Sequence, residues 1–106
     1  MKDRIRIAQR FADIINSDKI VTIILFGSVA RGDDTEESDI DILIVSPVAH
    51  EIRDEINNVV VDIVINDEEF ISAHLMSEDH FNETMNFPFL TNVLEEGMVL
   101  GWRIHK

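Results

Sequence analysis

Two short apolar runs rich in β-branched residues, Ile20–Phe26 and Ile42–Val45, enclose a polar stretch of the chain. Runs of this kind are typical of buried β-strands. Asp39 and Asp41 open the second run, and residues two apart on a strand point to the same face. We therefore expect their carboxylates to lie together. Because close like charges repel, a hard divalent cation such as magnesium is expected between them.

The other end of the polar stretch suits an anion. Gly27 and Ser28 follow the first run directly. A glycine and a small hydroxyl residue at the exit of a strand leave backbone N–H groups free to face phosphate. The same two residues could also be a turn glycine and a helix N-cap, and these roles are compatible with anion binding. A phosphate site and a magnesium site together predict a metal-bound nucleoside triphosphate.

Two further residues of this stretch have open roles. Arg31 would contact phosphate or form a surface ion pair with one of the acidic residues Asp33, Asp34 and Glu36. Ser38 would support the triphosphate or cap the loop, and we favour the loop role.

A third carboxylate interrupts another apolar run. Asp62 lies within Val59–Ile65, which we interpret as a third strand. Because burying an unpaired carboxylate is costly, Asp62 should face an ion or open to water. The alternative is a half-exposed strand in which Val60 and Val64 share the wet face.

The pattern Gly27-Ser28-Val29-Ala30-Arg31-Gly32 followed by Ser38-Asp39-Ile40-Asp41 resembles the signature of the polymerase-β-like nucleotidyltransferase superfamily. It is most similar to the minimal nucleotidyltransferases of archaea and bacteria, which are often encoded beside a helical HEPN-type partner. The resemblance implies an α+β fold, a small mixed β-sheet flanked by helices. It also implies that Asp39, Asp41 and Asp62 bind two magnesium ions and act in catalysis, with Asp62 helping to deprotonate the incoming hydroxyl.

The resemblance further implies a function. We expect transfer of a nucleoside monophosphate, with AMP favoured, from the triphosphate to a hydroxyl group of a HEPN-type toxin, for which this chain is the antitoxin. One alternative is a non-catalytic antitoxin with a vestigial nucleotide site. Another is a transferase for small molecules of the aminoglycoside type, which the lack of an acceptor-binding domain disfavours.

Composition narrows the classes of partner. The 106 residues are expected to form one domain, 1–106, and their net charge of −12 without a basic stretch argues against stable nucleic-acid binding by the chain alone.

The absence of cysteine excludes disulfides and thiol catalysis. No apolar run reaches the ~20 residues of a membrane span, so we expect a cytoplasmic protein. A homo-oligomer is compatible with the sequence.

The remaining elements follow from periodicity and turn residues. We expect a helix over 3–16, a loop over 27–38 with one helical turn, a short helix or connection over 49–57, a helical stripe of Phe70, Ile71, His74 and Leu75, a turn capped by Ser77, a last helix from Pro88 to a C-cap at Gly97, and an edge strand over 98–102. The histidines His50, His74, His80 and His105 show no metal-binding spacing and are interpreted as surface or boundary residues. The aromatic residues Phe81, Phe87, Phe89 and Trp102 are interpreted as core or as a partner-facing patch rather than as a stack for a nucleobase.

Overall fold

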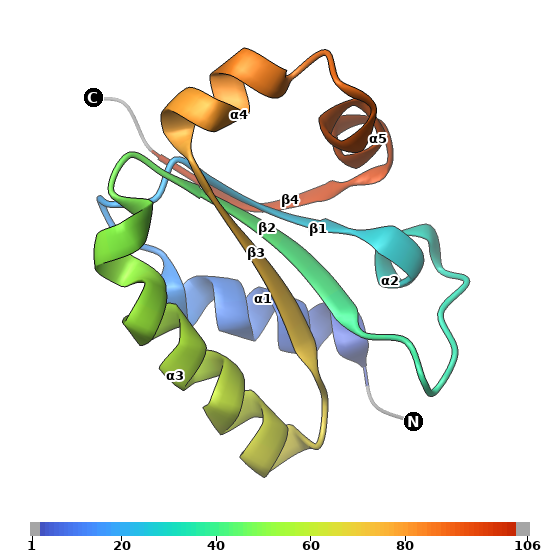
Figure 1. The fold of residues 1–106 in the computed structure, drawn as a ribbon. Helices are drawn as coiled ribbons and strands as arrows, with labels where there is room; N and C mark the ends of the chain where they lie inside the picture. The colour runs from blue at the N-terminus through green and yellow to red at the C-terminus, as the bar shows by residue number, and fades with distance from the viewer. Residues whose placement is uncertain (1–2, 104–106) are drawn as a thin grey trace.

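The computed structural model describes residues 3–103, which form a four-stranded mixed sheet with helices on both faces (Figure 1). The elements in chain order are α1 (Arg4–Ile15), β1 (Thr22–Phe26), α2 (Gly27–Arg31), β2 (Ile40–Ser46), α3 (Ala49–Asp67), β3 (Ile71–Ser77), α4 (Glu78–Thr84), α5 (Pro88–Glu96) and β4 (Met98–Trp102). The strand order is β3-β2-β1-β4. Strand β1 is antiparallel to β2 and β4, whereas β2 and β3 are parallel. The expected α+β class with a small mixed sheet is confirmed.

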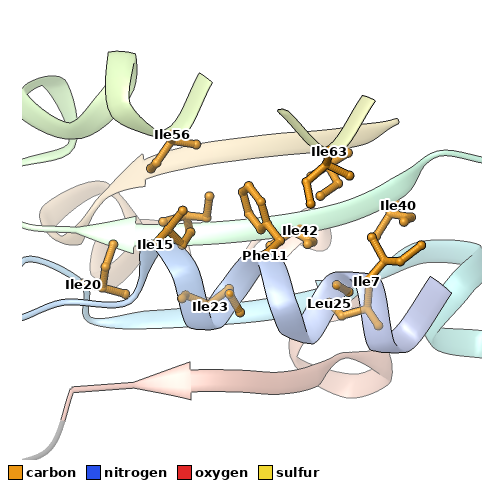
Figure 2. Packing of buried hydrophobic residues seen from close by; sticks show 14 of the residues in the cluster. Ile7, Phe11, Ile15, Ile20, Ile23, Leu25, Ile40, Ile42, Ile56 and Ile63 are labelled. Carbon is orange, nitrogen blue, oxygen red and sulfur yellow. The ribbon is translucent and has the colours of Figure 1, made fainter. Parts of the chain in front are cut away.

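The two faces of the sheet carry separate hydrophobic clusters. Ile23 and Leu25 of β1 pack with α1 and α3, whereas Ile24 and Phe26 pack with α4 and α5. This alternation is the period of two that a strand imposes. Figure 2 shows the first cluster, in which Phe11 of α1 lies among isoleucines of the sheet and of α3. The sheet is therefore covered on both faces, which explains why its central strands are almost wholly apolar.

Most of the expected elements are confirmed. Helix α1 begins where the side chain of Asp3 accepts a hydrogen bond from the N–H of Arg6, and Pro88 is the first residue of α5. Ser77 caps α4 by accepting from the N–H of His80. The edge strand is β4, and Gly97 is the C-cap of α5. In residues 3–103, no helix combines the length and apolarity that a membrane crossing requires.

The helix expected over 49–57 is present but extends to Asp67, and the interpretation of residues 59–75 was wrong. The run Val59–Ile65 is the second half of the long helix α3, and the third strand of the chain is Ile71–Ser77. Ile52, Ile56 and Ile63 of α3 are buried against the sheet, and this spacing is that of one helix face. The residues taken for a helical stripe after position 70 therefore belong to β3.

The chain topology brings the end of β1 and the beginnings of β2 and β3 together at one end of the sheet. Strand β1 ends at Phe26, directly before α2, and β2 begins beside it with Asp41 paired with Phe26. Strand β3 is parallel to β2 and places Ser72 opposite Asp41. In Figure 1 this end of the sheet is the one next to α2. The residues predicted to bind metal and phosphate on the polar stretch therefore meet at this end.

Candidate active site

The turn from β1 into α2 depends on Gly27. Its φ is +77°, a conformation that L-residues with a side chain rarely adopt. A Cβ atom at this position would lie 2.4 Å from Oδ2 of Asp41, which is too close for any real contact. Both the backbone conformation and the approach of the Asp41 carboxylate therefore favour glycine at this position. Ser28 follows as a partly buried residue that lines the same site.

Asp41 faces the side of the sheet that α5 covers. Leu43 and Val45, two and four residues later on β2, belong to the cluster with Leu90 and Val93 of α5. The pKa of Asp41 is raised, mainly because partial burial disfavours the charged form; the negative charge of Asp39 raises it further, and His74 and Arg31 oppose the rise. Asp39 is exposed and lies directly before β2. The expected pairing of the two carboxylates at a metal stays a prediction, which the charge effect of Asp39 on Asp41 supports.

The neighbouring strand contributes a histidine. Nε2 of His74 lies 3.7 Å from Oδ1 of Asp41, and Oγ of Ser72 lies 3.3 Å from the same nitrogen. The sequence-based interpretation of His74 as an ordinary surface histidine missed this contact, because it depended on a helix where β3 stands. His50 and His80 are exposed elsewhere, and His105 lies outside the described residues.

Helix α5 forms a wall of the site that the sequence did not predict. A hollow of about 380 Å³ lies at the end of the sheet next to α2. Its lining is Phe26, Gly27, Ser28, Arg31 and Asp41 on one side and Phe89, Asn92, Val93 and Glu96 of α5 on the other. The α5 residues recur at helical spacing. That spacing marks a helix face, but nothing local in the sequence indicates that this face meets Gly27.

The carboxylate of Glu96 accepts hydrogen bonds from Gly27 and Arg31, two of the residues that were expected to bind phosphate. Its Oε1 accepts a hydrogen bond from the N–H of Gly27 at 3.2 Å, and both carboxylate oxygens lie 3.2 Å from Nη1 of Arg31. Arg31 also pairs with Asp33, as one alternative predicted. Hydrogen bonds to Asp33 and then to Glu96 raise the pKa of Arg31. An anion therefore already sits against Gly27 and Arg31, and it is a side chain of the protein.

The loop that leads to Asp39 is held by Arg4. Its guanidinium donates to the backbone oxygens of Thr35 and Glu36 at 2.6 and 3.0 Å. It also pairs with Asp34 and with Glu69, each at 3.1 Å. Within the loop, the N–H of Thr35 donates to Oγ of Ser38 at 2.9 Å, so Ser38 has the loop-capping role that we favoured.

Asp62 is not part of this site. It is an exposed residue of α3, and α3 covers the face of the sheet opposite to the one that Asp41 and α5 share. Residues 3–103 contain no group of three or more histidine and acidic side chains placed to hold a metal ion. The predicted triad of Asp39, Asp41 and Asp62 is therefore wrong in its third member.

The carboxylates that remain still fit one kind of metal site. Magnesium in nucleotide enzymes is commonly bound by one or two carboxylates, and phosphate oxygens and water complete its octahedral shell. Asp39 and Asp41 offer such a pair, and the repulsion that contributes to the raised pKa of Asp41 is what a cation would relieve. The pair suits a metal that arrives with its nucleotide better than a metal caged by the protein.

Comparisons with known proteins identify the family and the fold of the chain. The family model described as a nucleotidyltransferase domain matches residues 6–99. A protein of Methanocaldococcus jannaschii, provisionally named as a protein adenylyltransferase, is 49% identical over 82 residues. The match covers 77% of this chain and 79% of the relative.

Two solved structures share the fold. One is a provisionally assigned nucleotidyltransferase from Sulfolobus solfataricus, with a TM-score of 0.55 and 21% identity, covering 95% of this chain and 85% of that one. The other is a toxin–antitoxin with AMP-PNP, with a TM-score of 0.58 and 17% identity, covering 96% of this chain and 74% of that one. At these identities the similarity establishes the fold alone.

Proposed function

The chain belongs to the nucleotidyltransferase-domain family of enzymes, and we propose that it transfers AMP from magnesium-bound ATP to a hydroxyl group of a partner protein. The observation that carries the proposal is the single hollow lined by Gly27, Ser28, Arg31 and Asp41, with Asp39 beside it. A triphosphate with its cation needs donors and carboxylates side by side, and this hollow offers both.

In the proposed reaction, Asp39 and Asp41 would hold magnesium, which neutralises the phosphate oxygens when it is bound. The N–H of Gly27, the hydroxyl of Ser28 and the guanidinium of Arg31 would orient the phosphates. The acceptor oxygen bonds to the α-phosphorus, the bond to the β-phosphate oxygen breaks, pyrophosphate leaves, and the hydroxyl proton is lost to solvent. Positioning and charge stabilisation account for most of the catalysis in such transfers.

Entry of the nucleotide requires a change at Glu96. Its carboxylate accepts from Gly27 and pairs with Arg31, and it would repel an incoming phosphate. The nucleotide must therefore replace Glu96 at these donors. Glu96 is partly exposed on the last turn of α5, so its side chain can turn to solvent without disturbing the core.

Four observations support a protein as the acceptor. The Methanocaldococcus relative is provisionally named as a protein adenylyltransferase, and one structural neighbour is a toxin–antitoxin with AMP-PNP. The segment 87–94 exposes large apolar side chains, including Phe87 and Leu94, as surfaces that bind proteins commonly do. The net charge of −12 favours a partner with basic groups. We propose a HEPN-type toxin as this partner.

One observation favours a second candidate, a binding antitoxin that has kept the nucleotide site without transfer. The third carboxylate that the family resemblance implies has no counterpart in the metal-binding geometry of residues 3–103. Without it, deprotonation of the acceptor has no assigned group on this chain. An antitoxin that inhibits its toxin by contact would need only the nucleotide site and the exposed apolar side chains of the segment 87–94.

Intact-mass measurement of the partner distinguishes the two candidates. The chain would be incubated with the product of the adjacent gene, ATP and magnesium, with a matched sample in EDTA as control. We expect the partner to gain the mass of one or more AMP units only when magnesium is present. A tight complex whose partner keeps its original mass would instead support the binding antitoxin.

A further inference from the structure

An aromatic cluster of Phe26, His74 and Phe89 lies beside the hollow and joins the sheet to α5. The ring of Phe26 is buried, at 8% exposure, and meets the ring of Phe89 edge-on, with centroids 5.6 Å apart and planes at 89°. The centroid of the His74 ring lies 5.2 Å from that of Phe26 and 6.1 Å from that of Phe89. Phe89 itself is 44% exposed. The ring of Phe89 thus packs against Phe26 and His74 on one side and lines the hollow with its exposed part.

This exposed ring shares one hollow with the proposed phosphate site. Gly27, Ser28 and Asp41 line it from the sheet and α2, and Phe89 and Asn92 line it from α5. Its volume of about 380 Å³ lies within the range of small-ligand sites. A nucleotide whose phosphates lie at Gly27 would extend its base along the remaining wall, which is α5.

We propose that Phe89 is the platform on which the nucleobase of the substrate stacks. The inference rests on the proposed function, because it takes the triphosphate to lie at Gly27 and Asp41. Aromatic rings are suited to this role because every base has a π face, and stacking on one ring strengthens binding about tenfold. Asn92, three residues later on the same helix face, adds an amide that can donate and accept at the edge of the base. The sequence alone favoured a core or partner-facing role for Phe89 over base stacking, and its position in the wall of the hollow is the reason to propose stacking instead.

Comparison of two ligands isolates the base from the phosphates. Calorimetry would measure the Kd of magnesium-ATP and of magnesium-tripolyphosphate for the wild type and for Phe89→Ala. We expect Phe89→Ala to weaken ATP binding about tenfold and to leave tripolyphosphate binding unchanged. Phe89→Trp, which keeps an aromatic face, should retain the affinity for ATP.

Phe70→Ala is the matched control, because Phe70 is also an exposed phenylalanine, at 61%, and does not line the hollow. It should bind both ligands as the wild type does. Unchanged ATP affinity in Phe89→Ala, or equal losses for ATP and tripolyphosphate, would overturn the stacking role while the proposed function stands. A wild-type protein that binds neither ligand would overturn the proposed function and this inference with it.

Discussion

Gly27 and the carboxylate of Asp41 are in such close contact that a side chain on Gly27 would force the carboxylate to move, since a Cβ there would come within 2.4 Å of Oδ2 of Asp41. The contact joins the two halves of the sequence motif directly. The glycine that shapes the expected phosphate turn also makes room for a carboxylate expected to bind the metal. Substitution at this one position should therefore affect both.

Gly27→Ala is predicted to cost stability and nucleotide affinity together. The positive φ alone should lower the free energy of unfolding by about 1–2 kcal/mol, and the clash should displace Asp41. Gly32→Ala is the matched control, because Gly32 has a φ of +80° but nothing within 4 Å of an added Cβ. Urea unfolding and calorimetry with magnesium-ATP should show a similar strain in both variants and a loss of binding in Gly27→Ala alone. Equal ATP binding by the two variants would contradict the role of this contact.

Asp41→Asn is predicted to stabilise the protein at neutral pH. The pKa of Asp41 is raised in the folded state, so the folded protein holds the proton more tightly than the unfolded chain does. Ionisation therefore reduces stability as the pH rises from about 4, the usual value for aspartate, through the raised pKa. The variant should gain less than about 1 kcal/mol, since the carboxylate is only partly buried.

This gain should be present at pH 7 and vanish near pH 3, which urea unfolding at the two pH values would measure. A gain of the same size at both would show that repulsion and desolvation of the carboxylate are not its source.

Arg4→Ala is predicted to lower the free energy of unfolding by about 3 kcal/mol, because it leaves the carboxylate of Glu69 without its partner in a nearly buried position. It should also raise the magnesium concentration needed for ATP binding, since the loop before Asp39 loses its support. Arg6→Ala, on the same helix with a side chain 83% exposed, should change stability by less than about 0.5 kcal/mol. Similar chemical denaturation midpoints for both variants would refute the anchoring role.

Asp62→Asn is predicted to leave AMP transfer and magnesium-ATP affinity unchanged. The residue is exposed on α3, across the sheet from Asp41. The catalytic role that the family resemblance implies for Asp62 would instead make this variant lose most of its turnover. A steady-state assay with the partner protein would decide between the two expectations, and a turnover reduced by orders of magnitude would mean that α3 rearranges to bring Asp62 into the site.

The sequence could predict what local patterns determine. Apolar runs bounded by Gly27 and by Asp39 identify β1 and β2, and Pro88 and Gly97 mark the ends of α5. The run Val59–Ile65 was misread because seven consecutive residues, six of them apolar, fit a strand and a helix equally well. The wider spacing of Ile52, Ile56 and Ile63 carries the helical period.

Strand β3 had its own signal. Ile71, Ala73 and Leu75 alternate toward the cluster beneath α1 and α3, which is the period of a strand. The helical stripe was inferred instead from Phe70, Ile71, His74 and Leu75. Phe70 is an exposed residue outside β3, so one of the four apolar positions does not belong to any buried face.

The α5 wall could not be predicted from local patterns. Glu96 reaches Gly27 across 69 positions of sequence, and Phe89 meets Phe26 only because the last helix folds back over the sheet. Such contacts are set by tertiary packing. They decide what lies opposite the motif, which the motif itself does not encode.

Transfer of label from ATP to the partner protein tests the central claim most directly. The chain would be incubated with magnesium, the product of the adjacent gene, and ATP labelled either at the α- or at the γ-phosphate. We predict that the partner retains the α label and no γ label, and that Asp39→Asn combined with Asp41→Asn abolishes the transfer while the fold persists. Retention of the γ label, or equal α labelling by the double variant, would contradict nucleotidyl transfer at Asp39 and Asp41.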